Sequence, residues 1–173
     1  MKGTHPFVAV LMGSDADLPT MQSSLDVLKK LGIRTEVRIT SAHRTPEATH
    51  AYVKDADARG CATFIAAAGL AAHLAGTVAA LTTRPVIGVP MESGPLSGMD
   101  ALLSTVQMPG GIPVACVAIG TAGAKNAAYL AAEILALSDP DLAMRLKQER
   151  VENAGAIMEK DRDLQQRLSK QPS

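Results

Sequence analysis

Short apolar runs alternate with segments of helical periodicity along most of the chain. Five runs have the length and composition of strands, and they span residues 7–12, 33–40, 63–67, 85–89 and 114–119. In the segments between and after them, apolar residues recur at helical spacing over 18–31, 46–59, 71–81, 99–106 and 122–137. Strands that alternate with helices are typical of a parallel sheet covered by helices on both faces. The pattern therefore predicts a three-layer α/β/α domain built on five parallel strands.

The second run differs from the other four. Its polar and apolar residues alternate, so that Arg34, Glu36 and Arg38 share one face, whereas Phe7–Met12 is apolar throughout. A strand with a charged face is expected near a sheet edge, and continuously apolar strands are expected in its interior. We therefore expect a flavodoxin-like strand order, in which the loops after the first three strands lie together and ligands bind at the carboxyl ends of the strands.

The tail from residue 139 onward has a different character. Residues 139–168 have the pattern of one long, densely charged helix with an apolar stripe. We therefore divide the chain into a flavodoxin-like domain over 1–138 and a helical extension over 139–173. An apolar face on such a helix needs a surface to cover it, and we expect that surface to be a neighbouring subunit. The alternative is a helix that lies back on its own sheet.

The loop after the first strand, residues 13–17, is the first candidate binding segment. Ser14 precedes a helix, where free backbone amides and a hydroxyl suit an anionic group such as a phosphate. Asp17 can hold sugar hydroxyls, as acidic residues do in dinucleotide sites. The alternative is that both residues only cap the helix.

The loop after the second strand, residues 41–45, carries the most chemistry. Ser41 supplies a hydroxyl, and Arg44 supplies a guanidinium, the natural bidentate partner of a phosphate. His43 has a side chain that gives and takes a proton near neutral pH, so it is the candidate acid and base. Thr45 is positioned to cap the next helix, with Pro46 as its first residue. The alternative for His43 is an ordinary surface histidine.

Small residues dominate the loop after the third strand, residues 67–76. Gly69 and Ala71 allow a ligand to approach the backbone closely, and the amides there suit a carboxylate or CO2 oxygen. His73 is expected in the first turn of the next helix. It either lines the pocket or makes a structural hydrogen bond.

Composition narrows the class of protein. There are 17 basic and 17 acidic residues, and only two Phe and two Tyr, so the chain lacks the basic surplus and the ring surface of a nucleic-acid-binding protein. Walker, dinucleotide-fingerprint and zinc-protease motifs are absent, and His and Cys have no metal-ligand spacing. Cys61 and Cys116 lie in apolar runs and are expected to be free, buried thiols. The residues thus predict no cofactor and no metal.

Targeting signals are also missing from the pattern. No basic segment precedes an apolar core near the amino terminus, and no apolar run reaches the roughly 18 residues of a membrane helix. We therefore expect a cytoplasmic protein with no membrane partner.

The loops together resemble a known enzyme family. The stretches MGSDAD, SAHRTP, AGLAAHLAG, PVIGVP and LSGMDALLSTVQMP, with QMPGGIPV and GAKNAA, occur in the order found in N5-carboxyaminoimidazole ribonucleotide mutases of bacterial purine biosynthesis. The resemblance covers residues 8–137, and SAHRTP combined with QMPGGIPV is its most specific part. It implies conversion of N5-carboxyaminoimidazole ribonucleotide to 4-carboxy-5-aminoimidazole ribonucleotide without metal, ATP or biotin.

The resemblance also implies residue roles. It assigns substrate binding to Ser14, Asp17, Ser41 and Arg44. It assigns catalysis to His43, which first gives a proton and later takes one back. Between these two steps the released CO2 stays in a pocket near Gly69 and Ala71. It implies homo-octamers whose C-terminal helix reaches across subunits.

Three positions depart from the family pattern. Ala16 stands at a usual serine, Leu70 at a usual glycine and Ala75 at a usual proline. The nearest alternative function is the related carboxylase, which adds free CO2 to aminoimidazole ribonucleotide. Its motif usually has Lys at the position of Arg44, so Arg44 favours the mutase. A non-catalytic nucleotide-binding module is the alternative from another class, and the presence of His43 argues against it.

Overall fold

The computed structural model describes residues 6–169, so residues 1–5 and 170–173 of the two expected segments lie outside it. Five parallel strands form one sheet in the order β2-β1-β3-β4-β5. The strands are β1 (Phe7–Met12), β2 (Thr35–Ile39), β3 (Cys61–Ala68), β4 (Val86–Pro90) and β5 (Ala115–Cys116). The predicted flavodoxin-like order is confirmed, and β2 lies at an edge of the sheet, as its charged face predicts.

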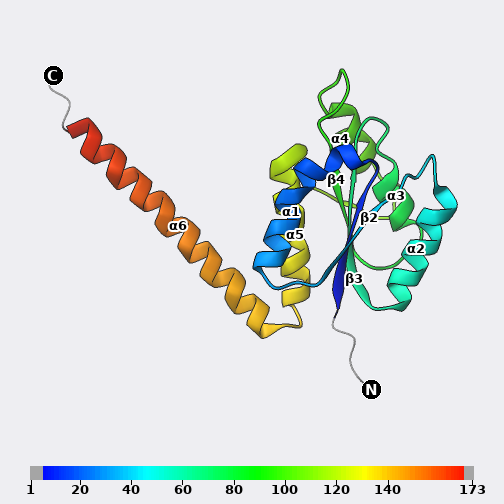
Figure 1. Ribbon diagram of the computed structural model, residues 1–173, viewed down its shortest axis with the longest axis horizontal. Coiled ribbons are helices and arrows are strands. Elements are labelled where there is room, and N and C mark those ends of the chain that lie inside the picture. The colour runs from blue at the N-terminus through cyan, green and yellow to red at the C-terminus, as the bar shows by residue number, and fades with distance from the viewer. Residues whose placement is uncertain (1–5, 170–173) are drawn as a thin grey trace.

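Helices cover both faces of this sheet (Figure 1). They are α1 (Leu18–Lys30), α2 (Pro46–Ala58), α3 (Leu74–Ala79), α4 (Met99–Val106), α5 (Gly120–Ala136) and α6 (Pro140–Ser169), with a 3-10 turn at Asp15–Asp17. The pair α1 and α5 lies on one face, and α2 and α3 lie on the other. The three-layer α/β/α architecture is therefore confirmed.

Alternate residues of β1 build the two halves of the core. Val8 and Val10 pack in a cluster with α1 and α5, whereas Ala9 and Leu11 pack in a cluster with α2 and α3. All four are fully buried, because successive side chains of a strand point to opposite faces of the sheet. The central position of β1 places the loop that follows it in the middle of the carboxyl edge.

The third helix is shorter than the predicted 71–81. It begins at Leu74, so His73 precedes the helix instead of lying in its first turn, and it ends at Ala79. Leu70 has a left-handed backbone with a φ of 56°, and the His73 amide donates to the Ala71 carbonyl at 2.9 Å. These turns occupy the residues that apolar periodicity assigned to the start of the helix.

The fifth strand is also shorter than the predicted 114–119. Only Ala115 and Cys116 pair with β4. Pro113 comes shortly before them and has no N–H to donate, and the left-handed Gly120 (φ 70°) starts α5 shortly after them. The Val117 amide still donates to the Gly88 carbonyl at 3.1 Å, but Ala115 and Ala118 are exposed, so the apolar run marks neither a long paired strand nor a buried one.

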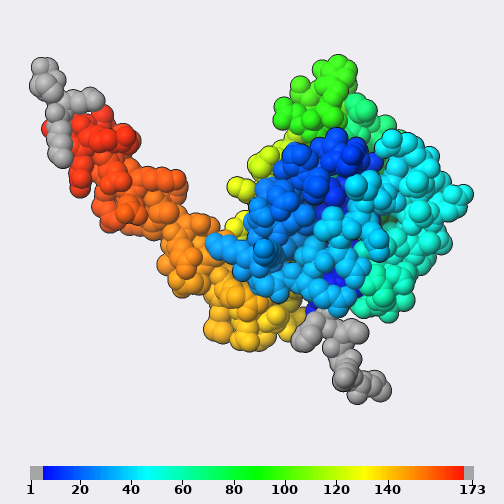
Figure 2. Space-filling view, in the orientation of Figure 1, coloured from blue at the N-terminus to red at the C-terminus, as the bar shows by residue number. Residues whose placement is uncertain are grey.

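Helix α6 leaves the body of the molecule (Figures 1 and 2). Its first part packs on the domain, where Leu142 and Leu146 join the core cluster on the α5 side. Residues 151–169 are all exposed. The alternative in which this helix lies back on its own sheet is therefore wrong for that stretch. No helix within residues 6–169 is long and apolar enough to cross a membrane.

Candidate functional site

One cavity of about 510 Å³ at the carboxyl edge of the sheet brings all the predicted site residues together. Those that line it are Ser14, Asp17, Ser41, His43, Arg44, Gly69, Ala71 and His73. They come from the loops after β1, β2 and β3, which are neighbours because β1 lies between β2 and β3. The adjacency of the loops follows from the strand order that the apolar pattern predicts.

The first loop forms a capping box around its 3-10 turn. The Ser14 hydroxyl accepts from the Ala16 amide at 3.2 Å, and the Asp17 carboxylate accepts from the Ser14 amide at 3.2 Å. Ser14 and Asp17 therefore cap the 3-10 turn, whereas the Asp17 side chain makes no capping hydrogen bond to α1, and both side chains also line the cavity. Burial raises the pKa of the Asp17 carboxyl, the Ser14 amide opposes that rise and the Asp15 charge adds to it.

The second loop is a tight turn held by its own hydroxyls. The Arg44 amide donates to the Ser41 hydroxyl at 3.1 Å, and the Ser41 amide donates to the Thr45 hydroxyl at 2.9 Å. Thr45 stands at the N-cap position of α2 as expected, but its side chain holds this turn instead of capping the helix. The turn fixes the backbone from which His43 projects.

Arg44 connects the second loop to the first. Its Nη2 donates to the Gly13 carbonyl oxygen at 3.1 Å, and its side chain is otherwise exposed at the cavity. A guanidinium carries five N–H donors, so this bond leaves others for a ligand. Arg44 therefore supplies a positive charge held at the loop that carries Ser14, in the same cavity, which suits a phosphate group.

His43 and His73 contact each other across the cavity. Nε2 of His43 lies 2.8 Å from Nδ1 of His73, and the rings meet edge to face with centroids 4.9 Å apart. One of the two nitrogens donates and the other accepts, depending on the tautomer. Sequence spacing does not predict this contact, because it depends on the turns at residues 70–73.

Ser93 is a cavity residue that the sequence interpretation missed. It lies in the loop after β4 and lines the cavity, and its hydroxyl is buried with no hydrogen-bond partner among the described residues. A signal for it exists in the sequence. In a flavodoxin-like order the fourth strand lies beside the third, so the loop rich in Gly, Pro and Ser that follows it belongs at the same edge.

The titratable groups of the described residues offer no other reactive centre of comparable geometry. Within residues 6–169 no group of three or more His, Cys, Asp or Glu side chains is suited to a metal ion. Cys61 is free and buried as predicted, and burial raises the pKa of its thiol to about 11. Cys116 is free but only partly buried.

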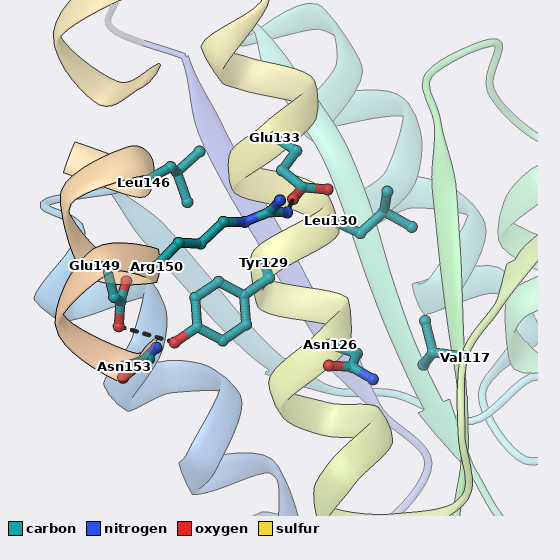
Figure 3. Close-up of a pocket in the computed structure, with 9 residues that line it drawn as sticks. All are labelled: Val117, Asn126, Tyr129, Leu130, Glu133, Leu146, Glu149, Arg150 and Asn153. Carbon is teal, nitrogen blue, oxygen red and sulfur yellow. Dashed lines mark hydrogen bonds and ion pairs between the residues drawn. The ribbon is translucent and has the colours of Figure 1, made fainter. Parts of the chain in front are cut away.

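A second cavity, of about 420 Å³, lies between α5 and α6 (Figure 3). Tyr129 and Glu133 of α5 face Glu149 and Arg150 of α6 across it. The Tyr129 hydroxyl donates to Glu149, and Arg150 pairs with Glu133. None of the predicted site residues lines this cavity, and its polar groups join two helices.

Comparison with known sequences supports the resemblance seen in the loops. The protein-family model for AIR carboxylase matches residues 7–156. The chain is 48% identical over 161 residues to the N5-carboxyaminoimidazole ribonucleotide mutase of Thermotoga maritima, and the aligned stretch covers 93% of each protein. It is 53% identical over 153 residues to the mutase of Brucella melitensis, covering 88% of this chain and 94% of that one.

A solved structure has the same architecture. The crystal structure of Treponema denticola PurE matches with a TM-score of 0.83 and 35% sequence identity. The match covers 92% of this chain and 99% of that chain.

Proposed function

The chain belongs to the AIR carboxylase family, and from that premise we propose that it converts N5-carboxyaminoimidazole ribonucleotide to 4-carboxy-5-aminoimidazole ribonucleotide in purine biosynthesis. The observation that carries the proposal is the single cavity that gathers the predicted loop residues around His43. Curated relatives at about half identity are named for this mutase activity. We place the reaction in the cytoplasm, with the small ribonucleotide as substrate.

Substrate binding is assigned to the loops after β1 and β2. The phosphate is held by the Arg44 guanidinium and the Ser14 hydroxyl, which lie together because Arg44 binds the Gly13 carbonyl. Asp17 and Ser41 hold sugar hydroxyls. Ala16 at the usual serine removes one hydroxyl from this set, and Arg44 with Ser14 remain.

The first half of the reaction is decarboxylation of the carbamate. Protonated His43 donates its proton to the carbamate nitrogen, and the N–C bond breaks with its electron pair remaining on that nitrogen. CO2 is released beside Gly69 and Ala71, where small residues leave room for it against the backbone amides. His73 lines the same cavity, and we assign it to substrate binding.

The second half is carboxylation at carbon. The C4 atom of the aminoimidazole attacks the retained CO2, and neutral His43 removes the C4 proton to restore the aromatic ring. His43 ends in the protonated state in which it began, so no external acid or base is consumed. Keeping CO2 against C4 makes the step intramolecular, which lowers a barrier by up to roughly 7–11 kcal/mol in favourable cases.

We also propose a homo-oligomer, an octamer by the family resemblance, in which the exposed half of α6 packs on a neighbouring copy. The support in this chain is the stretch 151–169, in which every residue is exposed, on a helix that leaves the body of the molecule (Figure 1). The division into a domain over 1–138 and an extension over 139–173 belongs to this proposal.

The activity is tested on the purified protein without added ATP or metal. One sample receives N5-carboxyaminoimidazole ribonucleotide, and a second receives aminoimidazole ribonucleotide with bicarbonate. We expect rapid formation of the 4-carboxy product in the first sample and slow formation in the second at low bicarbonate. Efficient conversion of the second sample alone would identify a carboxylase that uses free CO2.

The role of His43 is tested by His43→Asn, which keeps a polar side chain of similar reach but cannot transfer the proton. We expect turnover to fall by about 100-fold or more, with substrate binding and thermal stability nearly unchanged. His50→Asn is the matched control, because His50 is an exposed histidine of α2 that does not line the cavity. A His43→Asn protein that keeps more than about a tenth of the wild-type rate contradicts the assignment.

A further inference from the structure

The loops after β3 and β4 fit together at two consecutive positions. Gly69 packs its Cα against the side chain of Ser93, and a Cβ at position 69 would overlap that hydroxyl. One residue further on, the relation reverses. A Cβ at Gly94 would lie 2.5 Å from Cδ2 of Leu70, so the side chain of Leu70 occupies the space that glycine leaves open. Each loop therefore supplies one glycine and one side chain to the contact.

Leu70 adopts an unfavourable backbone conformation to make this contact. Its φ of 56° lies in the left-handed region, and among the non-glycine residues of the described chain only Ser97 shares a positive φ. In that region the Cβ of an L-residue is crowded, and glycine is the residue that avoids the penalty. The Leu70 side chain is also 52% exposed, so ordinary core burial does not explain it.

The position of Leu70 relates this strain to the site. Leu70 lines the cavity between Gly69 and Ala71, and its side chain reaches across to the loop that carries Ser93. An apolar branched side chain thus lies at the side of the cavity where the third and fourth loops meet. Strained residues persist where the surrounding structure holds them and often belong to functional sites.

We propose that Leu70 is the retaining wall of the CO2 pocket and sets the fraction of CO2 that reaches C4 instead of leaving. The inference rests on the proposed function. It makes Leu70, at a position where the family usually has glycine, a residue that determines how well this chain keeps the released CO2. Leu70 takes no part in proton transfer.

The chemistry defines what is lost when the wall is removed. After the N–C bond breaks, the bonding pair stays on nitrogen with the proton from His43, and CO2 is a small neutral molecule. If CO2 escapes, aminoimidazole ribonucleotide remains, and neutral His43 regains its proton from water. If CO2 is retained, C4 bonds to it and His43 regains its proton from C4. Escape and retention therefore give different products from the same bond cleavage.

The test uses N5-carboxyaminoimidazole ribonucleotide labelled with carbon-14 in the transferred carboxylate. The label released as gas is compared with the label retained in the 4-carboxy product, after subtraction of an enzyme-free blank. We expect Leu70→Ala and Leu70→Gly each to raise the ratio of released to retained label by about tenfold, the scale of losing a methylene-sized contact in an apolar pocket. Leu137→Ala is the control, because Leu137 is 89% exposed and does not line the cavity.

The two variants separate the side chain from the backbone. Both remove the wall, but only glycine relieves the left-handed strain, so Leu70→Gly is expected to unfold at a higher urea concentration than Leu70→Ala. If both variants form the 4-carboxy product at the wild-type rate and their ratio of released to retained label is unchanged, the inference is overturned and the proposed function stands. The same unchanged ratio with a lower mass by light scattering also overturns it and assigns Leu70 to a subunit contact. If the wild-type protein consumes the carbamate no faster than the enzyme-free blank does, the proposed function and the inference are overturned together.

Discussion

Glu36 joins the edge strand β2 to helix α2 through several donors. Its carboxylate accepts from Arg59 at 2.6 and 2.8 Å, from Arg34 at 3.2 Å and from the Tyr52 hydroxyl at 3.2 Å. The hydrogen bonds from Arg59 lower the pKa of Glu36 to about 2, because their effect is larger than the opposing effect of partial burial. Burial and the Glu36 charge raise the pKa of Tyr52 to about 12. The charged face of β2 is therefore bound to its own domain.

The low pKa of Glu36 predicts how its contribution depends on pH. A carboxyl whose pKa falls on folding, here from 4.5 to about 2, stabilises the protein above pH 4.5 and loses that effect as the pH falls toward 2. We expect Glu36→Gln to lower the free energy of unfolding by about 1 kcal/mol at pH 7, because the group is partly exposed and screened. Urea titrations of both proteins between pH 7 and pH 2.5 measure the difference.

The difference in the free energy of unfolding between wild type and Glu36→Gln is expected to shrink as the pH falls from 7 to 2.5. Glu159→Gln is the control, since Glu159 is an exposed carboxylate of α6. A difference between wild type and Glu36→Gln that is the same at every pH contradicts the role given to the ionised carboxylate.

The candidate site was predictable from the sequence wherever a residue follows a strand directly. His43 and Arg44 come after β2, and their residue types and strand position alone place them at the carboxyl edge. The contact between His43 and His73 was not predictable, because His73 was expected inside a helix from residue 71, whereas that helix begins only at Leu74. Ser93 was missed because its loop follows the fourth strand, and only the loops after the first three strands were expected to form the site.

At the scale of elements, helix ends were predicted best where a glycine or proline favours the backbone conformation that the end of a helix needs. Gly32 has a φ of 71° just after α1, and Pro46 is the first residue of α2, so both helices have their expected limits. The apolar run 71–81 contains no such residue before Leu74, and periodicity alone extended the predicted helix too far. Apolar pattern predicts burial, and hydrogen bonding decides where the element begins.

Glu149 connects three helices at one point. It belongs to α6, and its Oε1 accepts from Lys30 Nζ of α1 and from the Tyr129 hydroxyl of α5, both at 2.8 Å (Figure 3 shows the Tyr129 bond). Burial raises the pKa of Glu149, but the two donors lower it by more, so the carboxylate is charged at neutral pH. Its Oε2 is buried without a partner among the described residues. Glu149 thus fastens the base of α6 to the domain.

This arrangement predicts graded effects of substitution. We expect Glu149→Ala to lower the free energy of unfolding by about 2 kcal/mol, because it leaves the Tyr129 hydroxyl and Lys30 without their acceptor, and Tyr129→Phe by about 1 kcal/mol. Urea unfolding measures both, and hydrogen exchange over residues 140–150 reports whether the base of α6 loosens. Glu152→Ala, at an exposed position on the same helix, is the control. Equal effects of Glu149→Ala and Glu152→Ala contradict this role for the carboxylate.

At the scale of the whole molecule, the single chain exposes more apolar surface than a compact domain needs to. Exposed apolar residues of α6 include Ile157, Leu164 and Leu168, and those on or near α4 include Leu96 and Leu103. The formal net charge is zero, so no long-range repulsion keeps copies apart. Large exposed apolar patches mark interaction surfaces. Both features favour the proposed oligomer.

The apolar line on α6 allows this association to be tested without disturbing the domain. Ending the chain after Leu137 is expected to lower the oligomeric state, but it also removes Leu142, Leu146 and Glu149 from their contacts with the domain. A substitution in the exposed half avoids that complication. Ile157 lies on one line with Leu164 and Leu168, since residues seven and eleven positions apart share a helix face.

We therefore expect Ile157→Asp to lower the molar mass measured by light scattering, because a desolvated carboxylate without a partner opposes burial of this face. Gln166→Asp is the matched control, because position 166 is nine residues further on and half a turn away around the helix. It introduces the same charge on the opposite face and is expected to leave the mass unchanged. Circular dichroism should show equal helix content in both variants. If both variants keep the wild-type mass, this face of α6 does not hold the copies together; if both lose it equally, the charge and not the apolar line is responsible.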